Sequence, residues 1–246
     1  MSRPAYRLGE HVHACVSERR AVLLDLRRDA YFGMDAEQTR ALCGVVEGWP
    51  LPGDGPGASS GNASGVPPGE ALELAAELER RGLLTSARSG GRLATRHSVP
   101  AATDQLIPWE QMSSRHIRVS HVFRFLKSAL IAAALLRFHS LRFVVERAVK
   151  RKAACSSQMS PLDRNKACEI VSAFYYLRAF VYGKKKRCLF DSATLLELLS
   201  CYGIYPQWVI GVQAQPFSAH SWVQAEASVL NGTPEFVGAY TPILVV

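Results

Sequence analysis

The apolar and polar positions in the first part of the chain predict strands followed by a helix. Residues 11–16 alternate in polarity, residues 21–26 are rich in β-prone side chains, and residues 31–34 continue that trend. A period of two over such runs is typical of β-strands. Asp35 is a good N-cap, and the helical spacing after it predicts a helix that ends near Glu47.

The next segment predicts a flexible connection and then a second helix. Residues 50–69 are rich in Gly, Pro and Ser, which is typical of a loop or linker. A helix is expected over 70–81, with an apolar stripe that ends at Gly82, and residues 83–85 are expected to form a short final strand. The order β-β(-β)-α-α-β predicts a small winged-helix-like module over residues 1–86.

Helical periods dominate the middle of the chain. They follow a mostly polar segment, 87–113, that we expect to be a linker. A long basic amphipathic region reaches about Ala154, and two more helices are expected over 164–181 and 188–203. We therefore expect a second domain over residues 114–246.

The period returns to two in the last part of the chain. Residues 207–212, 220–223 and 228–230 are rich in β-branched and aromatic side chains, and they predict three strands. Helices that come first and antiparallel strands that come after are typical of an α+β domain.

The positive charge of the chain is concentrated in one region. The net charge is +8, and residues 115–152 contain ten Lys or Arg and one acid, Glu146. A second basic run, 184–187, directly precedes Cys188. Such clusters favour an acidic partner (a peptide, a nucleotide, a nucleic acid or a membrane surface), and the alternative is a solvated helix face. The 115–152 region is therefore a candidate for peripheral membrane contact.

The distribution of charge argues against a nucleic-acid binder. Residues 70–82 of the winged-helix-like module contain four acids and two arginines. A helix that reads DNA is expected to carry the positive charge itself. We expect no nucleic acid among the partners.

The six cysteines and the apolar segments indicate in which cellular compartment the protein is expected. No C-x-x-C pair or metal-ligand spacing occurs among the cysteines. The first residues lack the apolar region of a signal peptide, and the most apolar window, 128–136, is much shorter than a membrane span. We therefore expect a cytoplasmic protein with reduced thiols and no bound metal.

Cys188 is the first candidate for chemistry, because it lies at the expected start of a helix after a basic run. Backbone N–H groups and the helix dipole at that end favour an anion. Such a setting can lower a thiol pKa from ~8.5 into the range ~3.5–7.5, which provides a thiolate nucleophile at neutral pH. The alternative is a packing cysteine, since cysteine is common in protein cores.

His220 follows Cys188 by 32 residues, at the head of an expected strand. A helix-start cysteine that faces a strand histidine is the arrangement of papain-like and transglutaminase-like hydrolases. In that arrangement the imidazole acts as the general base for the thiol.

Four motifs surround these two residues: C-L-x-x-S from Cys188, W-V-I-G-V from Trp208, Q-P-F-x-x-H-S-W-V from Gln215 and V-L-N from Val229. Over about residues 185–232 the sequence thereby resembles the C-terminal domain of the lasso-peptide maturation proteases, the B proteins. The N-terminal module looks like the precursor-recognition element of the same family.

The resemblance implies a transglutaminase-like α+β fold and a Cys-His-Asp triad, with Cys188 and His220 at the family's Cys and His positions. It also implies cleavage of the leader from the core of a lasso-type precursor, beside an asparagine-synthetase-like cyclase. No intrinsically bound cofactor is expected, and the family implies a dependence on ATP.

The chain departs from the family at the third catalytic position. The family pattern ends V-x-N-D, whereas this chain reads Val229-Leu230-Asn231-Gly232, so Gly232 stands where the Asp is expected. Asn231 is our first candidate to orient His220, because an amide can accept the ring N–H. The alternatives are Glu226, Glu235, a Cys-His dyad, or a catalytically impaired carrier that binds the precursor for the partner cyclase.

Overall fold

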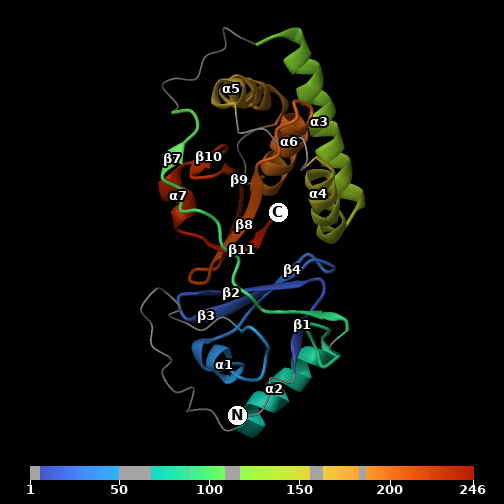
Figure 1. The fold of residues 1–246 in the computed structure, drawn as a ribbon, viewed down its shortest axis with the longest axis vertical. Coiled ribbons are helices and arrows are strands. Elements are labelled where there is room, and N and C mark those ends of the chain that lie inside the picture. Colours follow the sequence, from blue (N-terminus) through green and yellow to red (C-terminus); the bar gives the residue numbers. More distant parts are fainter. Residues whose placement is uncertain (1–5, 50–67, 88, 109–116, 156–162, 183–186) are drawn as a thin grey trace. The chain divides into compact units, whose positions relative to one another are not determined.

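The computed structural model describes the chain in six segments: residues 6–49, 68–87, 89–108, 117–155, 163–182 and 187–246 (Figure 1). The chain divides into two compact units. The first contains Met1–Ser98 with Val212–Ala219 and Thr241–Leu244, and the second contains Val99–Gly211 with His220–Tyr240 and Val245–Val246.

The first unit is built from two three-stranded sheets and two helices. The sheets have the strand orders β2-β3-β4 and β5-β1-β6. The elements are β1 (Arg7–Gly9), β2 (Val12–Ser17), β3 (Arg20–Asp25), β4 (Ala30–Gly33), α1 (Ala36–Ala41), α2 (Pro68–Arg80), β5 (Leu84–Thr85) and β6 (Gly91–Arg92). The strands expected near residues 11–34 and 83–85 are thus confirmed, and the winged-helix class of this unit stays a prediction.

Helix α1 begins as expected and ends earlier than expected. Asp35 accepts hydrogen bonds from the N–H groups of Glu37 and Gln38, and the Gln38 side chain accepts one from the N–H of Asp35, which completes a capping box. The helix ends at Ala41 and not near Glu47, so that part of the prediction was wrong. The chain turns instead through Gly44 and Gly48, whose φ angles of +82° and +75° cannot continue a helix.

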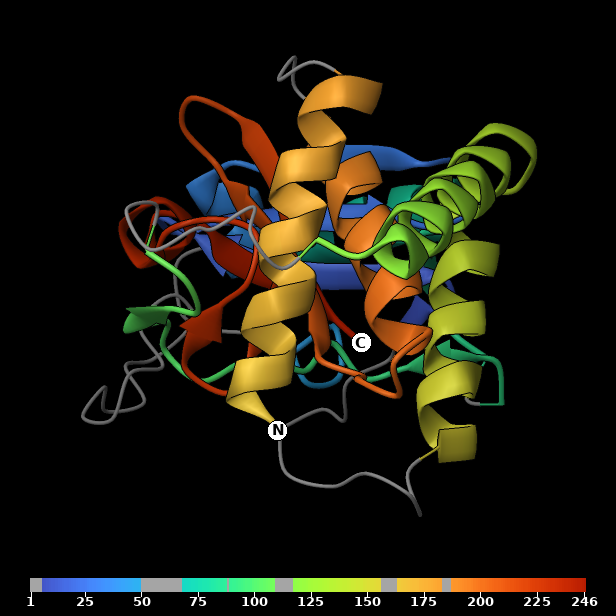
Figure 2. The same cartoon turned by 90° about the horizontal axis from the view of Figure 1, so that it is seen from above.

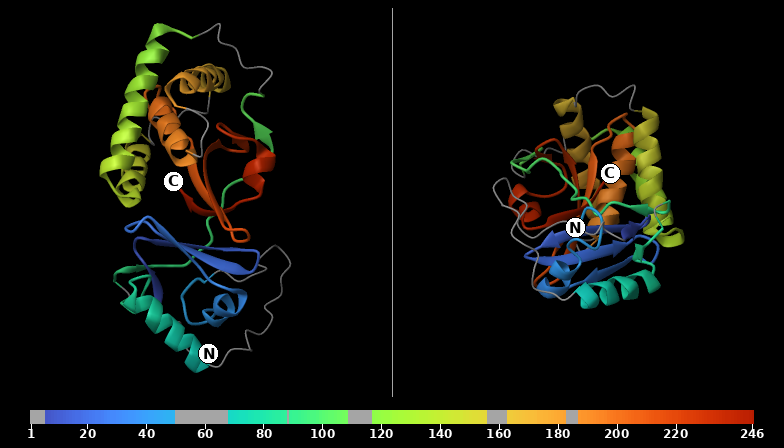
Figure 3. Two further views of the ribbon diagram at one scale, coloured as in Figure 1. Left: turned by 180° about the vertical axis from the view of Figure 1, so that it is seen from behind. Right: turned by 60° about the horizontal axis from the view of Figure 1, so that its bottom comes forward.

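The second unit begins with four helices. The bounds are α3 (Val119–Phe138), α4 (Leu141–Cys155), α5 (Arg164–Val181) and α6 (Cys188–Ser200). The basic amphipathic region is divided into α3 and α4 by a break at His139 and Ser140, and α5 has the bounds that the sequence predicts. Helix α3 packs along α6, and α6 lies between α3 and the strands of this unit (Figures 2 and 3).

A five-stranded sheet follows the helices, with the order β11-β8-β9-β10-β7. Its strands are β7 (Asp104–Gln105), β8 (Gln207–Gln213), β9 (Ser218–Ala225), β10 (Ser228–Val229) and β11 (Thr241–Val245), and α7 (Pro234–Gly238) precedes β11. The three strands expected after residue 206 are confirmed, and the arrangement is α+β. The segment 87–113, expected as a linker, contains β6, which pairs with β1, and β7, which pairs with β10.

Close packing of β8 against β9 holds the indole of Trp222 in place. Trp208 and Trp222 are both 1% exposed. A Cβ added at Gly211 would lie 2.8 Å from the Trp222 ring and 2.9 Å from the Tyr240 Cβ, so only glycine fits there. The position of Trp222 matters because it stacks on His220, as described below.

Helix α3 extends beyond the apolar window 128–136 at both ends. The sequence window 128–136 is short, whereas the whole helix Val119–Phe138 is long and apolar enough to cross a membrane by length and composition. A third of its apolar window is buried inside the protein. No other helix in the described ranges passes this test.

Candidate active site

Cys188 is the first residue of α6, and its side chain is partly buried. The preceding residue, Arg187, has φ −118° and ψ 40° and provides no side-chain cap. The first N–H groups of α6 therefore lack a capping acceptor from Arg187, and such groups favour a negative charge at this end of the helix. The three lysines of the basic run at 184–186 lie outside the described residues.

His220 is the third residue of β9 and lies among aromatic rings. Its ring centroid is 6.1 Å from that of Trp222 in a stacked arrangement, 4.9 Å from that of Phe236 and 5.4 Å from that of Tyr240. Burial among these rings lowers the pKa of His220 below its ordinary value. The imidazole is therefore neutral at physiological pH, which is the form that accepts a proton from a thiol.

The Nε2 atom of His220 is buried and has no hydrogen-bond partner among the described residues. A buried ring nitrogen without a partner costs free energy unless a ligand or water satisfies it. No hydrogen bond joins Cys188 to His220 in the described part of the chain. Hydrogen bonds of a catalytic pair often tighten only when the substrate is bound.

Asn231 connects the helix of the cysteine to the strand of the histidine. Its Oδ1 accepts a hydrogen bond of 2.7 Å from the backbone N–H of Val223, three residues after His220 on β9. Its Nδ2 donates one of 3.0 Å to Oγ of Ser192, one helical turn after Cys188 on α6. The side chain thus fixes the spacing between the two elements.

The structure gives Asn231 these two partners and, among the described residues, no hydrogen bond to the His220 ring. Its role as the third catalytic residue stays a prediction, and the observed contacts favour a positioning role. The sequence placed both residues near the site, Ser192 through the C-L-x-x-S motif and Asn231 through the V-L-N motif, but it did not indicate a hydrogen bond between them.

The carboxylates considered for the third position lie elsewhere. Glu226 is exposed, with φ +51°, in the turn after β9, and Glu235 is exposed in the first turn of α7. No described carboxylate forms an ion pair or hydrogen bond with His220. A Cβ added at Gly232 would lie 3.5 Å from the methyl groups of Val229 and Val237, which is ordinary contact, so this position has room for a side chain.

A partly buried polar cluster, which the sequence did not indicate, lies in the first turn of α6. Arg178 donates a hydrogen bond of 2.6 Å to Asp191 Oδ2. Burial raises the pKa of Asp191, because desolvation outweighs the attraction of the guanidinium, and it also raises the pKa of Tyr182. The ion pair ties the first turn of α6, and therefore Cys188, to the end of α5.

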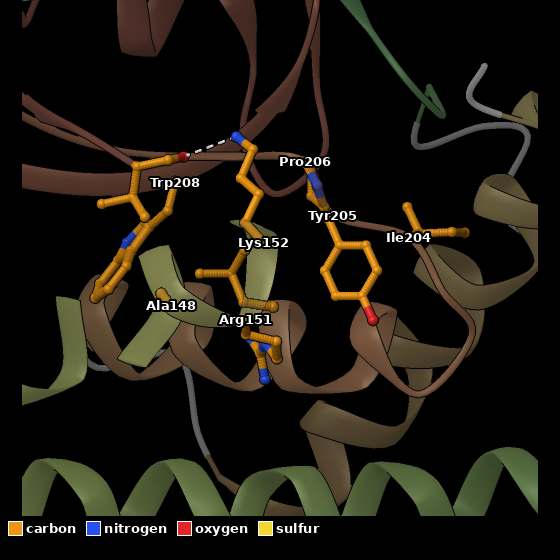
Figure 4. A pocket seen from close by; sticks show the side chains of 9 residues that line it. Ala148, Arg151, Lys152, Ile204, Tyr205, Pro206 and Trp208 are labelled. Atoms are coloured by element: carbon orange, nitrogen blue, oxygen red, sulfur yellow. Dashed lines mark hydrogen bonds between the residues drawn. The ribbon is translucent and has the colours of Figure 1, made fainter. Parts of the chain in front are cut away.

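A small, partly open pocket lies in the same unit but away from these residues (Figure 4). Arg151, Lys152, Tyr205 and Trp208 are among its lining residues, and Cys188, His220 and Asn231 are not. Lys152 directs its amine to the backbone oxygen of Val246, and burial lowers the pKa of Lys152. The described residues contain no group of three or more His, Cys, Asp or Glu side chains that could hold a metal ion.

Comparison with known protein families finds a match in the second half of the chain. A family model described as the Transglutaminase-like superfamily matches residues 128–245, a range that contains Cys188, His220 and Asn231. This segment is therefore similar to transglutaminase-like domains. The helix-start cysteine and the strand histidine are the features that this superfamily leads one to expect.

The chain is also similar to the microcin J25-processing protein McjB of Escherichia coli. The two are 38% identical over 64 residues, which is 26% of this chain and 29% of McjB. The chain thus covers less than a third of that relative, and the match is local. Both comparisons support the resemblance to lasso-peptide maturation proteases, and no solved structure matches the chain.

The bridging role of Asn231 gives a testable result. We expect Asn231→Ala to leave the buried N–H of Val223 without an acceptor, which costs about 1–3 kcal/mol in the free energy of unfolding. Cleavage should slow by less than it does when the nucleophile is lost. Urea unfolding and cleavage rates would measure both effects.

Ser192→Ala is the matched variant for this test, because it removes the partner on α6 and keeps the bond to Val223. In a double-mutant cycle, Asn231→Ala and Ser192→Ala should be non-additive. Fully additive effects on both stability and rate would show that Asn231 does not connect the two elements.

Proposed function

We propose that this chain is a cysteine peptidase that cleaves the leader from a lasso-type ribosomal peptide precursor. The proposal rests above all on Cys188 at the start of α6 and a neutral, partly buried His220 on β9. Asn231 links these two elements, and all three residues lie within the segment 128–245 that matches the transglutaminase-like superfamily. A cytoplasmic location belongs to the same proposal, since a reducing compartment keeps the thiol free to react.

The proposed reaction has two steps. His220 accepts the proton of Cys188, and the thiolate attacks the carbonyl carbon of the last leader residue. The peptide bond breaks, the core leaves as an amine that takes the proton from His220, and the leader remains as a thioester on Cys188. Water then attacks the thioester, which releases the leader acid and restores the thiol.

The partners follow from the proposed family. The substrate would be a lasso-type precursor, and a separate cyclase would act on the released core. McjB is named for the processing of a microcin, which supports a peptide precursor as the substrate class. Dependence on the cyclase or on ATP stays a prediction from the resemblance.

The second candidate function is a carrier that binds the precursor without cutting it, and Gly232 is the observation that favours it. Incubation of the purified chain with the precursor, read by mass spectrometry, separates the two. A peptidase yields two peptides whose masses sum to that of the precursor plus one water. A carrier leaves the precursor intact with and without cyclase and ATP.

We further propose that the first unit binds the leader as an added strand. Strand β4 lies at one end of the sheet β2-β3-β4, and the edge of a sheet can pair with an extended peptide. We expect residues 1–98 to bind a labelled leader peptide with about the affinity of the whole chain, within roughly tenfold. Fluorescence anisotropy would measure both constants.

The bounds of this fragment include β6, because β6 completes the sheet with β1. Residues 99–246 serve as the matched control and should bind the leader much more weakly. Binding confined to residues 99–246 would contradict this division of labour and would leave the peptidase proposal intact.

A further inference from the structure

Helix α3 presents a row of exposed apolar side chains to solvent. Val119, Phe123, Leu126 and Leu130 are 72%, 70%, 45% and 72% exposed, and they follow one another at helical spacing on a single face. Phe138, at the last turn, is 75% exposed. We call Val119, Phe123, Leu126 and Leu130 the α3 outer face, and Phe138 lies at its flank.

The opposite side of α3 is buried inside the protein. His121, Phe125, Ser128, Ala129, Ala132 and Leu135 are buried there, and α3 packs along α6 with this side. Single exposed apolar residues are ordinary, whereas a continuous apolar row rimmed by polar residues marks a contact surface. At 1.5 Å per residue the helix is about 30 Å long, so the row is an extended surface.

The charges around this face are positive. Helix α3 contains no acidic residue, and Lys127 and Arg137 are exposed and form no ion pair within the described residues. Helix α4 adds the exposed Phe143 and Lys150. The acid on α4, Glu146, is already paired with Arg142.

We propose that the α3 outer face binds the surface of an anionic membrane, with the helix lying in the plane of the interface. A bilayer surface with acidic headgroups offers both an apolar layer and negative charge, which matches an apolar row rimmed by Lys and Arg. A second copy of this chain would place like charges opposite each other, which is unfavourable. Since the inner side of α3 is held by α6, the helix lies on the membrane and does not span it.

Vesicle sedimentation tests this surface with the full chain. We expect the wild-type protein to bind phosphatidylcholine vesicles that contain phosphatidylglycerol, and to bind pure phosphatidylcholine at least about tenfold more weakly. Added salt should weaken the binding. The double variant Phe123→Ser, Leu130→Ser should reduce partitioning by about tenfold or more. Leu72→Ser is the matched control, because Leu72 is 49% exposed on α2 and should not change the partitioning.

A second pair of variants tests the charge while the apolar row is kept. Lys127→Glu with Arg137→Glu should remove the preference for anionic vesicles, and Arg40→Glu, on α1, should not. All variants should cleave the precursor in solution at the wild-type rate, because each replaces an exposed side chain and none is among the residues assigned to the site. That readout separates a failure of the membrane proposal from a failure of the peptidase proposal.

Three results would overturn the proposal. The first would be that the wild-type protein binds neither kind of vesicle, and the second that the outer-face variants bind as well as wild type. The third would be that vesicles are not bound and that size-exclusion chromatography shows a dimer that Phe123→Ser abolishes. The last result would assign the face to a second copy of the chain. Circular dichroism of each variant establishes that the fold is retained.

Discussion

Cys188→Ala is expected to abolish cleavage of the precursor, with a loss of about 10⁶-fold in turnover, as for other covalent nucleophiles. The alanine has no group that can form the thioester, so the proposed mechanism has no substitute for it. Binding of the leader should be unchanged, because the proposed binding edge, β4, belongs to the first unit. Single-turnover cleavage and anisotropy titration would measure the two effects separately.

Cys201→Ala is the matched control for this variant. Cys201 is an exposed thiol at the other end of α6, where its Sγ lies 3.4 Å from the backbone oxygen of Glu197. Its loss should leave turnover within a few-fold of wild type. Turnover by Cys188→Ala within about tenfold of wild type would remove Cys188 as the nucleophile.

His220→Ala is expected to lower turnover by about 10⁴-fold or more, because the thiol loses the base that takes its proton. Iodoacetamide should also react more slowly with Cys188 in this variant. An unchanged alkylation rate would show that the two residues do not form a pair.

The pH dependence follows from the sign of the His220 shift. Because burial lowers the pKa of His220, the neutral form persists below pH 6.5, the ordinary value for histidine. The ascending limb of the pH–rate profile should therefore have its midpoint below pH 6.5. A midpoint above that value would mean that an acid, not burial, dominates the surroundings of His220.

Gly232→Asp tests the same pH dependence in the opposite direction, because it adds a carboxylate. The position has room for a side chain, and the family pattern has an Asp there. A carboxylate near the imidazole favours its charged form, so the limb should move to higher pH while turnover stays the same or rises. A large loss of turnover would indicate that Gly232 is required for the fold of this turn.

The larger elements could be predicted from the sequence because each carries its own local signal. Asp163 caps α5, and apolar residues recur along that helix at helical spacing, so its bounds were predicted correctly. The first-turn signal of α1 was equally clear. The end of α1 was not clear from the sequence, because it is set by a tertiary contact. Gly44 and Gly48 turn the chain, and Val46 pairs with Tyr6, which lies 40 residues earlier in the sequence.

The short elements could not be predicted in the same way. Strands β1, β6 and β7 are two or three residues long, which is too short to show a period of two. Each is a strand only because a distant partner supplies its hydrogen bonds. Helix α7 has five residues, and β11 follows it directly, so neither was recognised.

The site shows the same division between local and tertiary signals. Cys188 and His220 could be selected from their motifs and from the elements on which they lie. The partners of Asn231 could not, because an amide can bond to any group that the fold brings near it. The aromatic surroundings of His220 were missed in part, since Phe236 and Tyr240 come from α7 and the residues after it.

The most direct test of the proposed mechanism is to look for the covalent intermediate itself. The protein and its precursor would be mixed, quenched in acid at early times, and analysed as intact protein by mass spectrometry. We predict an adduct whose mass equals the leader acid minus one water, located by peptide mapping on Cys188 and absent from Cys188→Ala. Cleavage of the precursor by Cys188→Ala, or an adduct located on another residue, would contradict the assignment of Cys188 as the nucleophile.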